Sequence, residues 1–119
     1  MDTSKLREED VPYVNEVVDY LAERELDVEL AGSALNGKRT YQDVDLLARG
    51  TPIAVTDATS GLMGLEAITE PFPKTSEDGS EYRVRRTGGP TKYVNNQIDE
   101  RFDIRAGNTI IDLSLKMNR

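Results

Sequence analysis

The stretch "AGSALNGKRTYQDVDLL", residues 31–47, places a Gly-Ser pair ahead of two aspartates that are separated by a single valine. Its last part, "DVDLLA" (43–48), is typical of a short apolar strand. Because successive side chains of a strand point to opposite faces, Asp43 and Asp45 share one face, roughly 7 Å apart along the strand. Such a pair is either the solvated face of an open sheet or a pair of ligands, and the surrounding sequence has to distinguish the two.

The composition restricts the available chemistry. A chain of 119 residues predicts one domain with a single core. The chain contains no cysteine and no histidine, so disulfides, zinc–thiolate sites, thiol nucleophiles and Ser-His arrangements are excluded. Any reaction must therefore use carboxylates, a bound metal, hydroxyls, or lysine and arginine.

The charge and the hydropathy pattern restrict location and partners. The net charge is −7, so the chain does not attract nucleic acid by overall charge, and contact with a polyanion needs a local basic face. No apolar run approaches the roughly 18 residues of a membrane span. The sequence begins without the basic-then-apolar pattern of a secretion signal. We therefore expect a cytoplasmic protein with no membrane association.

The order of predicted elements indicates an α+β domain that spans residues 1–119. Apolar residues at helical spacing predict a helix over 9–25, with Asp10 as its N-cap and Pro12 in its first turn. A second helix is expected over 56–70, capped by Thr56 or Asp57. Strands are expected at 27–32, 43–48 and 81–86, and as a hairpin around Ala106-Gly107-Asn108. The residues at 71–80 and 87–97 read as irregular. We expect a mixed or antiparallel sheet of about four to five strands, with the helices packed on one face.

A third carboxylate lies on the last predicted strand. In "TIIDLSL" (109–115), the apolar residues share one face, and Asp112 lies on the other. If this strand lies beside 43–48, Asp112 joins Asp43 and Asp45, and three close carboxylates repel one another unless a cation lies between them. Oxygen ligands suit Mg²⁺ or Mn²⁺, and two such ions roughly 3.5–4 Å apart serve phosphoryl and nucleotidyl transfer. Asp103, on the preceding strand, is the reserve candidate for the third carboxylate.

The Gly-Ser pair is compatible with the same chemistry. Gly32 permits a close approach of backbone and ligand. Free backbone N–H groups in the turn that follows, together with the Ser33 hydroxyl, are suited to hold a phosphate.

The segment from Leu30 to Leu47 resembles the signature of the polymerase-beta-type nucleotidyltransferase superfamily. In that signature an apolar strand runs into Gly-Ser, and Asp-apolar-Asp-apolar follows about ten residues later. "RFDIRAGNTIIDLSL" (101–115) is similar to the later strand that carries the third carboxylate in these enzymes. The closest match in size is the minimal, single-domain group, whose members often occur beside a separate helical partner protein.

The resemblance implies roles for individual residues. Asp43 and Asp45 would hold the ion that carries the triphosphate, and Asp112 would help to bind a second ion and to deprotonate the acceptor. Gly32 and Ser33 would hold the β- and γ-phosphates. Minimal members often carry an arginine soon after Gly-Ser, and Lys38 or Arg39 would supply that charge here. The implied reaction moves a nucleoside monophosphate, AMP by analogy, from an NTP such as ATP to an acceptor hydroxyl on a protein, an RNA or a small molecule. The implied partners are this acceptor and either a helical protein or further copies of the chain.

Four arginines are predicted to lie on the same face as the aspartates, namely Arg83, Arg85, Arg101 and Arg105. They either contact the triphosphate or a polyanionic acceptor, or they form a solvated face balanced by Glu81, Asp99 and Asp103. Two other functions also stay open. The chain is alternatively a non-catalytic nucleotide-binding or partner-binding module, such as half of a two-protein complex, or an unrelated α+β domain with a chance match.

Overall fold

The computed structural model of the chain describes residues 3–32, 34, 41–67, 82–88, 91–93 and 96–118. The helices in these ranges are α1 (Val11–Ala22) and α2 (Pro52–Ala67). The strands are β1 (Asp27–Ala31), β2 (Val44–Gly50), β3 (Tyr82–Gly88), β4 (Thr91–Tyr93), β5 (Asn96–Ile98), β6 (Glu100–Ala106) and β7 (Thr109–Met117).

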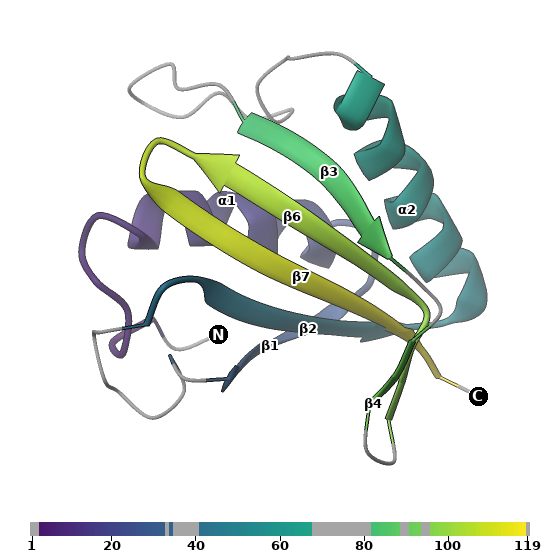
Figure 1. Cartoon of the computed structure of the whole chain (residues 1–119). Coiled ribbons are helices and arrows are strands. Elements are labelled where there is room, and N and C mark those ends of the chain that lie inside the picture. The colour runs from purple at the N-terminus through teal and green to yellow at the C-terminus, as the bar shows by residue number, and fades with distance from the viewer. Residues whose placement is uncertain are drawn as a thin grey trace.

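Five of the strands form one mixed sheet in the order β1-β2-β7-β6-β3 (Figure 1). The pairs β1–β2, β7–β6 and β6–β3 are antiparallel, whereas β2 and β7 run parallel. The last strand in the sequence is therefore the middle strand of the sheet, with β2 on one side and β6 on the other. The expected α+β class and mixed sheet are confirmed.

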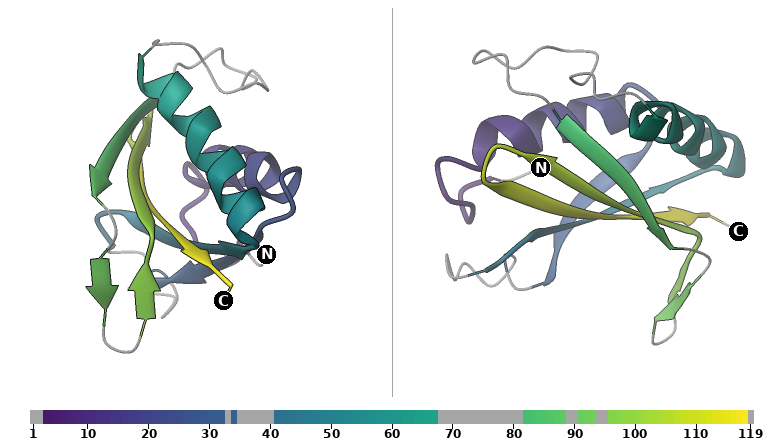
Figure 2. Two further views of the ribbon diagram at one scale, coloured as in Figure 1. Left: turned by 90° about the vertical axis from the view of Figure 1, so that its right-hand side faces the viewer. Right: turned by 45° about the horizontal axis from the view of Figure 1, so that its top comes forward.

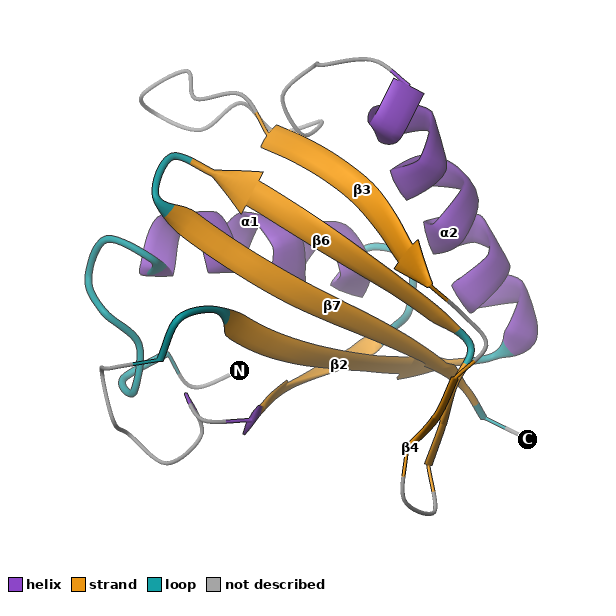
Figure 3. Cartoon of the chain, in the orientation of Figure 1, coloured by secondary structure: helices purple, strands orange, loops and turns teal. Residues whose placement is uncertain are grey.

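Both helices cover the same face of this sheet (Figures 2 and 3). The strands beneath them alternate between buried and half-buried residues, as in the pattern BiBiBiB of β2, and the inward side chains form the core with α1 and α2. The largest fully buried side chains include Leu21, Leu46, Leu62, Tyr82, Phe102, Ile104, Leu113 and Leu115. The other face of the sheet, which we call the open face, carries the polar residues of the same strands. No described helix covers the open face.

The helix α1 is shorter than the predicted 9–25 and is not capped as expected. Asp10 occupies the N-cap position, and Pro12 lies in the first turn, but the Asp10 side chain makes no capping hydrogen bond. That carboxylate is buried and accepts hydrogen bonds from Tyr41 and Thr109 instead. The expectation of a capping role was wrong because two distant hydroxyl groups reach the carboxylate.

The helix α2 begins four residues before the predicted start. Thr51 caps it, because its hydroxyl oxygen accepts the Ala54 N–H at 3.2 Å. Pro52 occupies the first helical position, where a missing N–H has no helical partner to lose. The prediction of Thr56 or Asp57 as the cap was therefore wrong.

Two hairpin-like connections complete the described fold. The expected hairpin joins β6 to β7, and Gly107 has a φ of +57° at the first turn position, as in a type II′ turn. Residues 87–97 are not wholly irregular, because β3 extends to Gly88 and the short strands β4 and β5 pair antiparallel. The predicted loop 71–80 lies outside the described residues.

Candidate metal centre

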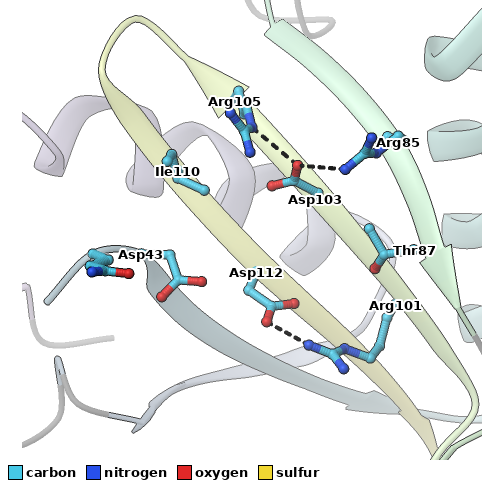
Figure 4. A pocket seen from close by; sticks show the side chains of 9 residues that line it. Asp43, Arg85, Thr87, Arg101, Asp103, Arg105, Ile110 and Asp112 are labelled. Carbon is cyan, nitrogen blue, oxygen red and sulfur yellow. Dashed lines mark hydrogen bonds and ion pairs between the residues drawn. The ribbon is translucent and has the colours of Figure 1, made fainter.

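Three aspartates meet on the open face where β2 and β7 run side by side. Asp43 immediately precedes β2, and Asp45 lies directly opposite Asp112 in the parallel register of the two strands. One carboxylate oxygen of each residue lies within 4.8 Å of those of the other two. Asp43 and Asp112 are seen on the same face in Figure 4. The predicted juxtaposition of all three carboxylates is confirmed.

The electrostatics of this triad show that it disfavours three negative charges. Burial, and after it the charges of Asp43 and Asp112, raise the pKa of Asp45 to about 6. Arg101 opposes this shift. Its Nη2 donates to Asp112 Oδ2 at 2.7 Å, so the nearest arginine already neutralises part of the charge. Additional positive charge at the triad would lower the pKa of Asp45.

The chemistry of the donors fits a hard divalent cation. All three donors are carboxylate oxygens, all are half-buried, and they converge from two adjacent strands. Mg²⁺ and Mn²⁺ prefer oxygen ligands, and carboxylate pairs commonly bind them together with phosphate oxygens. The arrangement therefore has the ligands that the expected metal ions require.

Gly32 lies at the end of β1 and is packed against the triad. Its φ is +65°, and a Cβ added at this position would lie 2.0 Å from Asp45 Oδ2. A side chain at position 32 would thus be strained and would displace the Asp45 carboxylate. The sequence suggested that Gly32 allows a ligand to approach the backbone, and the structure shows that it also makes room for a member of the triad.

Two hollows adjoin on the open face, and the triad lies between them. The glycine-side hollow has a volume of about 490 Å³ and is lined by Gly32, Asp45, Ile98 and Ser114, among others. The arginine-side hollow has a volume of about 380 Å³ and is lined by Arg85, Thr87, Asp103, Arg105 and Ile110, among others (Figure 4). Asp43, Arg101 and Asp112 line both hollows. A molecule in either hollow would therefore reach the triad.

Asp103, the reserve candidate, is not part of the triad. It lies opposite Asp112 in the β6–β7 register, but it is held between two arginines. Arg105 Nε donates to Asp103 Oδ2 at 3.1 Å, and Arg85 Nη2 lies 3.6 Å from the same oxygen (Figure 4). The expected placement of the arginines on the face of the triad is confirmed, because Tyr82, Val84, Phe102 and Ile104 on the opposite face are buried.

A buried hydrogen-bonded cluster lies behind the strands that carry the triad. The Asp10 carboxylate accepts from the hydroxyl groups of Tyr41 and Thr109 and from Arg7 Nε. Tyr41 lies two residues before Asp43, and Thr109 lies three residues before Asp112. The cluster therefore fixes the start of both strands relative to each other. Sequence reasoning missed it, because no local pattern links residues that are 31 and 99 positions from Asp10.

The remaining predicted site residues lie outside the described part of the chain. These are Ser33, Lys38 and Arg39. Their expected roles in phosphate binding stay predictions.

Comparisons of the chain with protein-family models, with curated proteins and with solved structures found no match. Among the helices that the structure describes, none has the length and apolar character needed to cross a membrane.

Proposed function

We propose that the protein is a metal-dependent nucleotidyltransferase that moves a nucleoside monophosphate, AMP by analogy, from an NTP to an acceptor hydroxyl. The observation that carries this proposal is the convergence of Asp43, Asp45 and Asp112 within 4.8 Å beside two open hollows. The resemblance of residues 30–47 to the polymerase-beta-type signature supplies the reaction class. The nucleotidyltransferase fold is part of the same proposal.

The triad would hold two ions, Mg²⁺ or Mn²⁺. When bound, such ions neutralise the triphosphate and stabilise the pyrophosphate that leaves. The triad supplies carboxylate oxygens for this task, and the raised pKa of Asp45 supports the proposal because a nearby cation would favour its ionised form.

The NTP is assigned to the glycine-side hollow. Gly32 lines this hollow together with all three aspartates, and it is exposed to solvent. The volume of about 490 Å³ lies within the roughly 300–1,000 Å³ that small-molecule sites span. Ser33, Lys38 and Arg39 are proposed to add phosphate contacts next to Gly32.

The transfer is a single displacement at the α-phosphorus. The acceptor oxygen forms a bond to this phosphorus, and the bond from the phosphorus to the oxygen bridging to the β-phosphate breaks. The electron pair of the broken bond leaves with pyrophosphate. We assign the acceptor proton to Asp112, whose carboxylate lines both hollows and therefore faces donor and acceptor alike.

The proposal is tested by following label from each α-³²P-labelled NTP in the presence of Mg²⁺ and a cell extract. We expect the wild type to transfer label and the Asp43→Asn/Asp45→Asn variant to transfer none. The matched control is Asp19→Asn/Asp57→Asn, which removes two exposed aspartates from the helices on the other face and is expected to behave as wild type.

Calorimetric titration with each NTP and Mg²⁺ separates the remaining outcomes. Mg²⁺-dependent NTP binding without any label transfer would favour the non-catalytic nucleotide-binding module. A wild-type protein that binds no NTP in the presence of Mg²⁺ or Mn²⁺ would contradict both nucleotide-based functions.

A further inference from the structure

The open face has an acidic side and a basic side. One row of cross-strand neighbours runs from Asp45 through Asp112 and Asp103 to Arg85. The adjacent row, which lies nearer the β6–β7 turn, runs from Ile110 through Arg105 to Arg83. On β2 and β7 the carboxylates lie at the Asp45–Asp112 pair, with Arg49 and Lys116 farther along the same two strands, whereas arginines dominate on β6 and β3.

Away from the triad, the described arginines of β3 and β6 outnumber the described carboxylates beside them, because the hollow lined by Arg83, Arg85 and Arg105 contains one carboxylate, that of Asp103. Arg83 and Arg105 are direct cross-strand partners, and like charges in this position destabilise a sheet. Asp103 lies between Arg85 and Arg105 and supplies one negative charge to two guanidinium groups. Both arginine side chains stay largely exposed, at 69% and 57%. An exposed group of three arginines around one carboxylate is suited to bind an anion.

We propose that the arginine-side hollow binds a phosphate group of the acceptor. The acceptor substrate is therefore a phosphate-bearing molecule. This inference rests on the proposed nucleotidyltransferase function. Guanidinium groups bind phosphate through paired, charge-assisted hydrogen bonds, and the Thr87 hydroxyl lines the same hollow. The net charge of the chain is −7, so this group of arginines is a local excess of positive charge on an acidic protein.

The distance between the two sides defines the shape of the acceptor. β7 and β3 are separated by two strand spacings, which is roughly 10 Å. An acceptor whose hydroxyl lies at Asp112 and whose phosphate lies at Arg85 must therefore span several bonds, as a nucleotide unit does. The row with Arg83 and Arg105 lies about 7 Å farther along the strands, at the position of a following phosphate. The transfer step is unchanged, since the acceptor oxygen replaces pyrophosphate on the α-phosphorus.

The test measures anion binding apart from metal and NTP. A 5′-fluorescein-labelled single-stranded hexaribonucleotide is titrated with protein in EDTA, and fluorescence anisotropy reports binding. Unlabelled uridine monophosphate serves as the competitor that represents small phosphorylated acceptors. We expect Arg85→Gln/Arg105→Gln, which removes two arginines that line the hollow, to weaken binding by roughly tenfold or more and to reduce the slope of log K against log salt by about 1–2. The control Arg24→Gln/Arg49→Gln removes the same charge away from the hollow and is expected to leave the slope unchanged.

The outcomes for this inference and for the proposed function are separable. Asp43→Asn/Asp45→Asn is expected to lose Mn²⁺ binding, which tests the metal centre, and to retain oligonucleotide binding. Arginine-dependent binding of the hexanucleotide supports a polynucleotide acceptor, and arginine-dependent binding of the monophosphate alone supports a small one. If neither probe binds, or if the arginine variant binds as the wild type does, the inference is overturned even when Mg²⁺-NTP binding is intact.

A transfer assay then connects the hollow with catalysis. With the bound probe as acceptor, Arg85→Gln/Arg105→Gln is expected to raise the KM for the probe by about tenfold while the NTP affinity stays unchanged. If the wild type binds both Mg²⁺-NTP and the probe but transfers no label to it, the assignment of this hollow to the acceptor is wrong.

Discussion

Both sides of the open face are built from strands that alternate between buried and more exposed residues, yet their charged groups differ in burial and in their response to pH. On β2 and β7, three half-buried carboxylates repel one another, and this repulsion contributes to the pKa of about 6 for Asp45. On β6 and β3, exposed arginines surround a single carboxylate and keep their charge at any accessible pH. The charge of the acidic side therefore changes with pH, whereas the charge of the basic side does not and is screened mainly by salt.

Removing one carboxylate from the acidic side gives the largest expected effect. Asp45→Asn is expected to lower the rate of transfer by roughly a thousandfold or more, because ligated metal ions supply several kcal/mol of transition-state stabilisation. In EDTA at pH 7.5 the same variant is expected to melt higher than the wild type by roughly 2–8 °C, because the mutual repulsion is relieved. Radiolabel transfer and thermal unfolding measure the two effects. A variant that loses stability in EDTA would contradict the electrostatic account.

Filling the space beside Asp45 gives the next largest effect. Gly32→Ala places a Cβ 2.0 Å from Asp45 Oδ2 at a φ of +65°, so the carboxylate has to move. We expect the affinity for Mn²⁺ to fall by roughly 10–100-fold, as for other disturbances around metal ligands, while hexanucleotide binding is retained. Electron paramagnetic resonance of free Mn²⁺ gives the affinity. Gly61→Ala is not a suitable control, because a Cβ there would lie 2.1 Å from the Tyr20 hydroxyl oxygen.

A change of pH is expected to affect the acidic side and not the basic side, so it distinguishes the two sides without any mutation. Asp45 has a folded-state pKa of about 6 and an ordinary value of 3.8, so between these values the folded protein holds a proton that the unfolded chain has released. The stability that Asp45 contributes to the metal-free protein is therefore fully present below about pH 4 and is lost as the pH rises through about 6.

A cation must displace the same proton, so we expect Mn²⁺ affinity to fall by roughly tenfold for each pH unit below about 6. Isothermal titration in buffers with different ionisation enthalpies counts the released protons. Hexanucleotide binding is expected to vary little over the same range. A metal affinity that is independent of pH between 5 and 7 would show that Asp45 is ionised in the metal-free protein.

Arg101 is the arginine that reaches into the acidic side, and its removal gives a smaller effect. The guanidinium group donates to Asp112 and lowers the pKa of Asp45, so it already supplies part of the positive charge that a bound metal ion would supply. We expect Arg101→Gln to change Mn²⁺ affinity near pH 7.5 by only a few-fold. The variant loses a positive charge that competes with Mn²⁺ for Asp112, and it also loses the charge that lowers the pKa of Asp45, so the two effects oppose each other. Its Mn²⁺ titration is expected to shift to higher pH than that of the wild type. An unchanged pH dependence would contradict the coupling between Arg101 and Asp45.

The smallest effect is expected from the cluster behind the strands. Tyr41→Phe removes one of the donors to the buried Asp10 carboxylate, and Thr109 and Arg7 continue to donate. Losing one hydrogen bond to a charged group costs about 1.5–3 kcal/mol. We expect a lower melting temperature and slightly weaker Mn²⁺ binding, because Tyr41 fixes the segment that leads to Asp43. Hexanucleotide binding by this variant is expected to equal that of the wild type.

Strand alternation was sufficient to predict which residues share the open face. It placed Asp112 with Asp43 and Asp45, and it placed the arginines of β3 and β6 on the same side. This works because a strand with one buried face tolerates no shift of a single residue, so the apolar residues determine where the polar ones point.

One error overlooked a local signal, and the others came from interactions that local patterns do not contain. The Thr51-Pro52 start of α2 was overlooked in favour of later capping candidates, although it is a local signal. The role of Asp10 was unpredictable, since its partners at Tyr41 and Thr109 become neighbours only in the folded chain. The association of Asp103 with arginines and not with the triad depends on the register of three strands, which the sequence alone does not specify.

The central position of β7 in the sheet affects how the protein folds during its synthesis on the ribosome. The described strand that is synthesised last separates β2 from β6, so the β1–β2 pair and the β3–β6 pair each keep an unpaired edge until residues 109–117 emerge. Contacts between such distant segments form slowly, and unpaired strand edges are prone to aggregate in the meantime. The acidic site also requires Asp112, which means that a partly synthesised chain has no complete triad. The complete triad that we propose as the ion site therefore forms only when β7 joins the two parts of the sheet.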